Sequence, residues 1–307
     1  MDRSGPLARL LILLSLALLP GAAFDASTLP IREARWVAPN AVYRNLTREP
    51  AECFAPPADP AGWRSAAIGR IAFRTPMLLG GQAARAGLSC ASCHRNGRGN
   101  PDFLFPGLSG EPGTADVTHS LVSRSRGDGQ FNPRPIPDLG GPRAALKIDQ
   151  RRETRALETF IRGLVAEEFD GRDPPSEVLE GLATYVRSLR PQACGRSDER
   201  VTLASRLSLV EQAVELAADA RGETRRLLLA AARSELGAID ERFSSEGLGA
   251  ARKVLSEAGR ELGSLREGGD LSRWRERWGG RRQILLRFER RSLFNPARLR
   301  RAMARAK

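Results

Sequence analysis

The stretch Cys90-Ala91-Ser92-Cys93-His94 decides what kind of domain this chain builds. C-x-x-C-H is the attachment signature of a c-type haem, in which each cysteine forms a thioether to one vinyl group. The histidine that follows is then placed beneath the iron as an axial ligand. The sequence therefore predicts one covalent haem c, attached to Cys90 and Cys93 and ligated by His94.

Two other uses of a C-x-x-C pair are a redox dithiol and half of a zinc site. A zinc site needs a second pair of ligands, whereas Cys53 and Cys194 stand alone and His119 is the only other histidine. A thioredoxin-like dithiol needs a strand–helix–strand context, and the residues around the motif are instead rich in Gly, Asn and Arg. Haem attachment is the favoured interpretation.

Residues 1–23 have the pattern of a secretory signal. Arg3 and Arg9 form a positively charged segment before an apolar run from Leu10 to Leu19. This run is too short to cross a bilayer. Small residues then predict cleavage near Ala23, and the alternative is an uncleaved anchor. We expect a periplasmic or secreted protein, which agrees with covalent haem attachment on the exported side of a bacterial membrane.

Two cysteines remain once the haem motif is set aside. In an oxidising compartment Cys53 and Cys194 are expected to form a disulfide. They bracket the haem motif in the sequence, so their bridge would close a long loop around it. The alternative is a pair of unpaired, buried thiols.

A chain of 307 residues with 41% hydrophobic residues suggests about two domains and a packed core. We predict a mainly α protein with an extended N-terminal arm at 24–60. A cytochrome c-like haem domain with long loops follows at 61–195, and a helical domain at 198–307. Helices are expected at 61–73, 153–166 and 177–189, the last with Ser176 as its N-cap. Four apolar residues are equally well explained as haem-pocket walls or as ordinary core: Phe103, Leu104, Phe105 and Leu108.

The region from about residue 198 is dominated by Ala, Leu, Glu and Arg. Helical periodicity predicts helices at about 200–220, 223–241, 248–267 and 271–291. Glycines separate them, which favours antiparallel helices in a small bundle or in long hairpins. The positions expected to face its core are Leu207, Val210, Val214, Ala217, Leu228, Ala232, Leu236 and Ile239.

The net charge of +13 is concentrated at the C-terminus, where residues 271–307 hold 13 Arg or Lys against 2 Asp or Glu. We expect no nucleic-acid partner, because an exported protein rarely meets nucleic acid. Trp274, Trp278 and Phe288 are interleaved with these arginines. The segment could contact an anionic membrane surface or an acidic redox partner. The favoured interpretation is a helix whose apolar side completes the bundle and whose arginines are solvated.

The sequence around the motif resembles a known family. The runs Leu78 to Gln82 and Leu88 to His94 are similar to the N-terminal haem domain of bacterial di-haem cytochrome c peroxidases and MauG-like proteins. So are Gly127 to Pro133, Pro135 to Leu139 and, at the end of the domain, the helix Leu179 to Leu189.

This resemblance covers about residues 61–193 and implies a cytochrome c fold. In the family, electrons pass from one haem to a second before peroxide is reduced. This chain carries a single C-x-x-C-H motif, so such a relay would need a second haem from another protein.

The second axial position of the iron separates the candidate functions, because Met or His there favours electron transfer and an open site permits peroxide binding. His119 is the leading candidate, and it is similar in order to the distal histidine of the peroxidatic domain. Met77, Met303 and an open or water-bound site are the alternatives. A peroxidase would also need a distal acid–base group, for which the loop carboxylates are Asp102, Glu111 and Asp116.

We therefore expect an exported mono-haem c-type cytochrome that exchanges single electrons with a redox partner protein. The leading alternative is a haem peroxidase-type oxidoreductase supplied with electrons by an external donor. A third class is a haem-bearing sensor or assembly subunit in which the helical domain is the working part.

Overall fold

The computed structural model describes residues 29–119, 121–142 and 146–306, and the predicted signal sequence lies outside them. The prediction of a mainly α protein is confirmed. Strand structure in the described ranges is limited to three short antiparallel ladders. They pair β1 (Arg48–Glu49) with β6 (Glu199–Arg200), β2 (His94–Arg95) with β3 (Arg98–Gly99), and β4 (Thr114–Ala115) with β5 (Arg134–Pro135).

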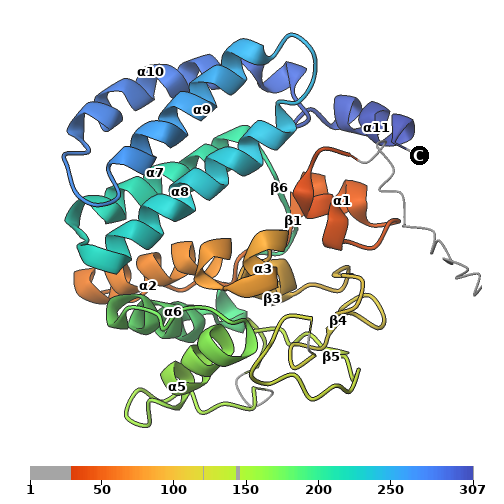
Figure 1. The fold of residues 1–307 in the computed structure, drawn as a ribbon, viewed down its shortest axis with the longest axis vertical. Coiled ribbons are helices and arrows are strands. Elements are labelled where there is room, and N and C mark those ends of the chain that lie inside the picture. Colours follow the sequence, from red (N-terminus) through yellow and green to blue (C-terminus); the bar gives the residue numbers. More distant parts are fainter. Residues whose placement is uncertain (1–28, 120, 143–145, 307) are drawn as a thin grey trace, which may run out of the picture.

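Two helices from opposite ends of the predicted haem domain, α2 (Pro60–Phe73) and α6 (Ser176–Ser188), pack directly on each other (Figure 1). Their backbones meet at two glycines, because a Cβ on Gly69 would lie 1.9 Å from the carbonyl oxygen of Gly181. The predicted range 61–73 agrees with α2 to within one residue, and the Asp59 side chain caps the helix by accepting the N–H of Gly62. Trp63, although apolar, is 51% exposed in the first turn of this helix.

The remaining helices of this region are short, and long loops join them as expected. They are η2 (Pro76–Leu78), α3 (Gly81–Ala86), α4 (Cys90–Cys93), α5 (Ala156–Gly163) and η5 (Pro191–Ala193). A wider helical turn, η4 (Leu164–Glu168), continues α5. Ser176 is not the N-cap of α6, because the cap position is Pro175 and Ser176 is the first helical residue.

The segment predicted as an extended arm contains two short helices, η1 (Arg32–Trp36) and α1 (Val42–Thr47). Ile31, Trp36 and Leu46 are buried, so the hydrophobic effect holds this segment against the body of the protein. Glu33 also pairs with Arg206 at 2.9 Å, across to the first helix of the C-terminal region. The arm is therefore part of the packed structure.

The four predicted C-terminal helices are confirmed with small changes at their ends. They are α7 (Leu203–Asp219), α8 (Gly222–Arg242), α9 (Gly249–Ser264) and α10 (Ser272–Phe288), the last followed by η6 (Glu289–Arg291). All eight apolar positions expected in α7 and α8 are buried. The helices form layers above α2 in Figure 1, and α2 contacts both α7 and α8. One apolar core runs through both predicted domains.

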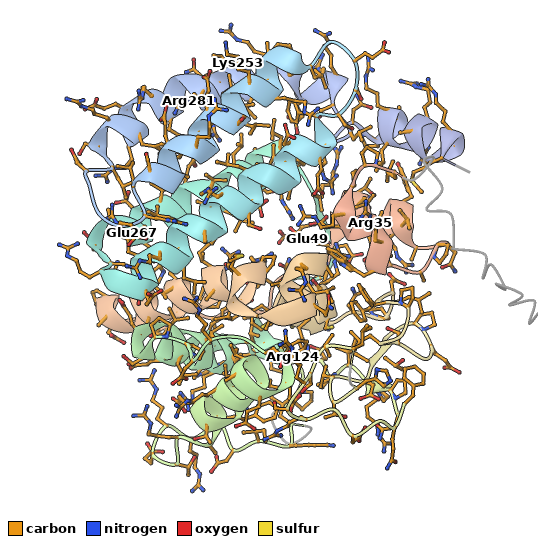
Figure 2. The ribbon with its side chains drawn as sticks, in the orientation of Figure 1. Arg35, Glu49, Arg124, Lys253, Glu267 and Arg281 are labelled. Atoms are coloured by element: carbon orange, nitrogen blue, oxygen red, sulfur yellow. A yellow bond between two sulfur atoms is a disulfide. The ribbon has the colours of Figure 1, made fainter. Side chains whose placement is uncertain are left out.

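The basic C-terminal segment completes this bundle. Trp274 and Trp278 are buried, and their rings stack with centroids 4.7 Å apart. Arg281 pairs with Glu261 of α9 at 2.6 Å, and Figure 2 shows Arg281 on the part of the bundle that faces away from α2. A further helix, α11 (Pro296–Arg305), was not expected from the sequence, and Leu299 buries its apolar side. Within the described ranges, no helix is both long and apolar enough to cross a bilayer.

Candidate haem-attachment site

The two motif cysteines lie on a single helical turn. Helix α4 begins with a capping box, in which the Ser89 N–H donates to Ser92 Oγ at 3.0 Å and the Ser89 side chain accepts from the backbone in return. Side chains three residues apart share one face of a helix. Cys90 and Cys93 therefore present their thiols on the same side of this turn, against the apolar core.

Both cysteines are free and partly buried, and both pack against the apolar core. Burial raises the pKa of Cys90 and of Cys93 to about 12, so both are neutral at pH 7. A dithiol that works by thiolate attack has a lowered pKa instead. The described residues also contain no group of three His, Cys, Asp or Glu side chains placed to hold one metal ion.

His94 is oriented by the backbone. Its Nδ1 lies 3.0 Å from the carbonyl oxygen of Pro137, and a carbonyl can only accept, so Nδ1 carries the hydrogen. Burial lowers the pKa of His94 to about 4, against the opposing effects of the Pro137 carbonyl and Asp138. The ring is therefore neutral at pH 7, and Nε2 keeps its lone pair for a ligand.

The loop that carries Pro137 is tied to the predicted disulfide. Cys53 and Cys194 are bonded, which confirms that prediction, and they are 141 residues apart in the chain. Arg98 lies between them and the loop, with Nη1 3.4 Å from Cys53 Sγ and Nε 2.7 Å from Asp138 Oδ2. The disulfide therefore lies close to the loop whose Pro137 carbonyl holds His94.

The apolar residues after the motif divide into two groups. Phe103 and Leu108 are fully buried and belong to the ordinary core. Leu104 and Phe105 pack against that core but keep part of their surface uncovered, as do Ile136 and Leu139 on the Pro137 loop. Partly covered apolar side chains of this kind suit the wall of a cofactor site.

His119 lies in the loop between β4 and β5, with its ring edge-on to Phe131 at a centroid distance of 5.7 Å. Its Nδ1 accepts the backbone N–H of Leu121 at 3.3 Å. Neutral imidazole has one donor and one acceptor nitrogen. His119 could therefore ligate iron through Nε2 only after Nδ1 gave up this hydrogen bond and took the proton.

The other candidates for the distal side have local structural roles or lie at the surface. Met77 is 65% exposed, and Met303 packs beside the small core under α11. Asp102 pairs with Arg44 at 2.6 Å. Asp116 is buried and accepts hydrogen bonds from the backbone of Thr118 and Asn132, which fixes its own loop.

Glu111 is the third carboxylate considered for proton transfer, and its side chain is exposed. Sequence reasoning assigned no role at the site to Pro137, Asp138 and Arg98, although Pro137 and Asp138 lie in the run Pro135 to Leu139 that resembles the haem domain. No spacing rule links them to His94, because the contact depends on how a loop of some forty residues folds back.

Searches against protein-family models, curated proteins and solved structures found no match to this chain.

Proposed function

We propose that this chain is an exported, mono-haem c-type cytochrome that carries single electrons. Haem would be attached to Cys90 and Cys93 and ligated by Nε2 of His94. The observation that carries the proposal is the hydrogen bond from His94 Nδ1 to Pro137, within a C-x-x-C-H motif. Haem-ligating histidines need their second nitrogen held in this way, because that bond fixes the ring and its tautomer.

The placement of the three side chains fits a porphyrin better than a bare metal ion. Two thiols on one helical face would hold the haem covalently, and the histidine beside them would ligate its iron. The partly uncovered side chains of Leu104, Phe105, Ile136 and Leu139 would cover the faces of the ring. When bound, the haem would supply a one-electron iron couple.

The packing of α2 on α6 supports a cytochrome c-like domain. Helices near the two ends of the domain meet through Gly69 and Gly181 with no side chain between them. Phe73, at the end of α2, lies 6.3 Å from the His94 ring and 5.2 Å from the Tyr185 ring on α6, as centroid distances. Phe73 therefore connects this helix pair to the proposed iron ligand.

The redox partner we propose is an acidic protein, and the surface of α11 is suited to it. Arginines 275, 277, 281 and 282 of α10 all pair with glutamates of α7 or α9. By contrast, Arg298, Arg301 and Arg305 on α11 are exposed and form no ion pair among the described residues. Unpaired surface cations steer an acidic partner and make its association rate sensitive to salt.

Optical spectroscopy and peroxide turnover test the proposed activity. We expect a haem that is reduced reversibly by one electron and whose ferric spectrum does not change with cyanide or peroxide. A high-spin ferric haem that consumes peroxide with a reduced donor would establish the peroxidase alternative instead. A stable complex that the full chain forms through residues 198–307 would support the sensor or assembly class.

The substitution His119→Ala tests the second axial position. If His119 ligates the iron in the wild-type haem protein, the ferric spectrum of the His119→Ala variant should be that of a haem with an open site. If the spectrum is unchanged, His119 is not the ligand, and its hydrogen bond with Leu121 persists in the haem protein.

A further inference from the structure

We propose that Arg98 is a positioning residue for His94, through which the Cys53–Cys194 disulfide supports the haem ligand. This inference rests on the proposed function, because it concerns the ligand of the haem. It adds a role for a residue and a disulfide that lie outside the haem motif itself.

Arg98 contacts both structures that it would connect. Its Nε lies 2.9 Å and 2.7 Å from the two carboxylate oxygens of Asp138. Its Nη1 lies 3.4 Å from Cys53 Sγ and 3.7 Å from Cys194 Sγ. The guanidinium is planar and rigid, so holding Nε against the carboxylate restricts the direction of Nη1, which faces the sulfur atoms.

Asp138 passes this constraint to the carbonyl that holds His94. The carbonyl of Pro137 belongs to the peptide group that joins Pro137 to Asp138, and that group is planar. Asp138 Oδ1 also accepts the backbone N–H of Gly140 at 2.9 Å, which closes a tight turn after the peptide. An Asp138 side chain held by Arg98 therefore restricts where the Pro137 oxygen can lie.

The disulfide contacts the same turn at a second point. Gly140 lies so close to Cys53 that an added Cβ would be 2.9 Å from the Cys53 sulfur. Gly140 also donates its N–H to the carbonyl of Gly97, one residue before Arg98. The turn is therefore enclosed by the disulfide on one side and by the β2–β3 connection on the other.

The strength of the bond from His94 to Pro137 affects the iron. A firm hydrogen bond from Nδ1 makes the imidazole a stronger donor to the metal. Stronger donation favours ferric over ferrous iron, so it lowers the midpoint potential. Loosening the Pro137 carbonyl should raise the potential while leaving the thioether attachment intact.

The test is a charge-balanced pair of substitutions, Arg98→Gln with Asp138→Asn, which removes the contact without changing the net charge. The matched control is Arg187→Gln with Glu158→Gln, because these residues form a similar two-point ion pair, at 2.8 and 2.9 Å, in the same domain. We expect the R98Q/D138N protein to keep one covalent haem and to show a higher midpoint potential, with the control unchanged.

A second variant, Cys53→Ala with Cys194→Ala, keeps the Arg98–Asp138 pair and removes the sulfur atoms together with the covalent bridge. It should shift the potential in the same direction by a smaller amount. This variant keeps the inference testable if R98Q/D138N does not fold.

An unchanged potential in both variants, or an equal shift in the Arg187 control, would overturn the role of Arg98. The proposed function would fail differently, by the absence of covalent haem from the wild-type protein. The two failures are therefore distinguishable.

Discussion

Removal of the Cys53–Cys194 disulfide should strongly destabilise the protein. The two cysteines are 141 residues apart, and a cross-link over a loop of this length reduces the entropy of the unfolded chain. In the chain-entropy treatment the contribution is about 5 kcal/mol. For a protein of this size it corresponds to a fall in Tm on the order of 10 °C in the Cys53→Ala, Cys194→Ala variant.

Denaturant unfolding of the wild type and the double variant measures this difference, with both followed by far-UV circular dichroism. Cys53 is fully buried and Cys194 is partly exposed, so reductant can reach the bridge in the folded protein only from the Cys194 side. The same reductant should leave the double variant unchanged, which is the control. Equal unfolding midpoints, with equal slopes, for the two proteins would refute the claim that this bridge lowers the conformational entropy of the unfolded chain.

Three further changes test the packing and charge of the fold. Gly69→Ala should destabilise the protein by more than about 3 kcal/mol in urea unfolding, because its Cβ would meet the backbone of Gly181 and backbone atoms cannot move aside. Glu33→Gln should destabilise at pH 7 but not near pH 2. Burial raises the pKa of Glu33, but Arg206 and Arg242 outweigh it and lower that pKa from 4.5 to about 2, so the stabilisation is lost as pH falls through that range. Trp278→Ala should cost about 3–5 kcal/mol in thermal unfolding because the ring is buried in the bundle.

Each of these changes has a control elsewhere in the chain. Gly237→Ala lies on α8 with no atom within 4 Å of the added Cβ, so it should be neutral or stabilising. Glu246→Gln removes an exposed carboxylate, and Trp63→Ala removes a ring that is 51% exposed. If Gly237→Ala costs as much as Gly69→Ala, the close approach of α2 and α6 does not explain the loss. Equal effects at Glu246 or Trp63 would likewise contradict the roles of Glu33 and Trp278.

The sequence predicts the helices well where one apolar face repeats over many residues. The buried positions of α7 and α8 follow from their spacing, because a long amphipathic helix must cover that face. This repeated apolar pattern does not reveal α11, whose ten residues carry four arginines and bury mainly Leu299. It fails also for Trp63, since a large apolar residue at the first turn of a helix can remain exposed.

The site is predictable only where covalent chemistry fixes the spacing. The C-x-x-C-H motif places two thiols and an imidazole by local geometry. Cys53 and Cys194 are the two cysteines outside the motif, so an oxidising compartment predicts that they pair. The support for His94 comes from Pro137, 43 residues along the chain. Any exposed carbonyl can accept one hydrogen bond, so nothing in its local sequence marks Pro137 for this role.

Covalent haem attachment is the central claim, and the intact mass of the denatured protein tests it most directly. The chain is expressed with its N-terminal segment in a bacterium that matures c-type cytochromes, and wild type is compared with Cys90→Ala, Cys93→Ala. We predict that wild type retains the added mass of one haem after denaturation, and that the double variant shows the polypeptide mass alone. A wild-type protein that carries no added haem under these conditions would contradict the account.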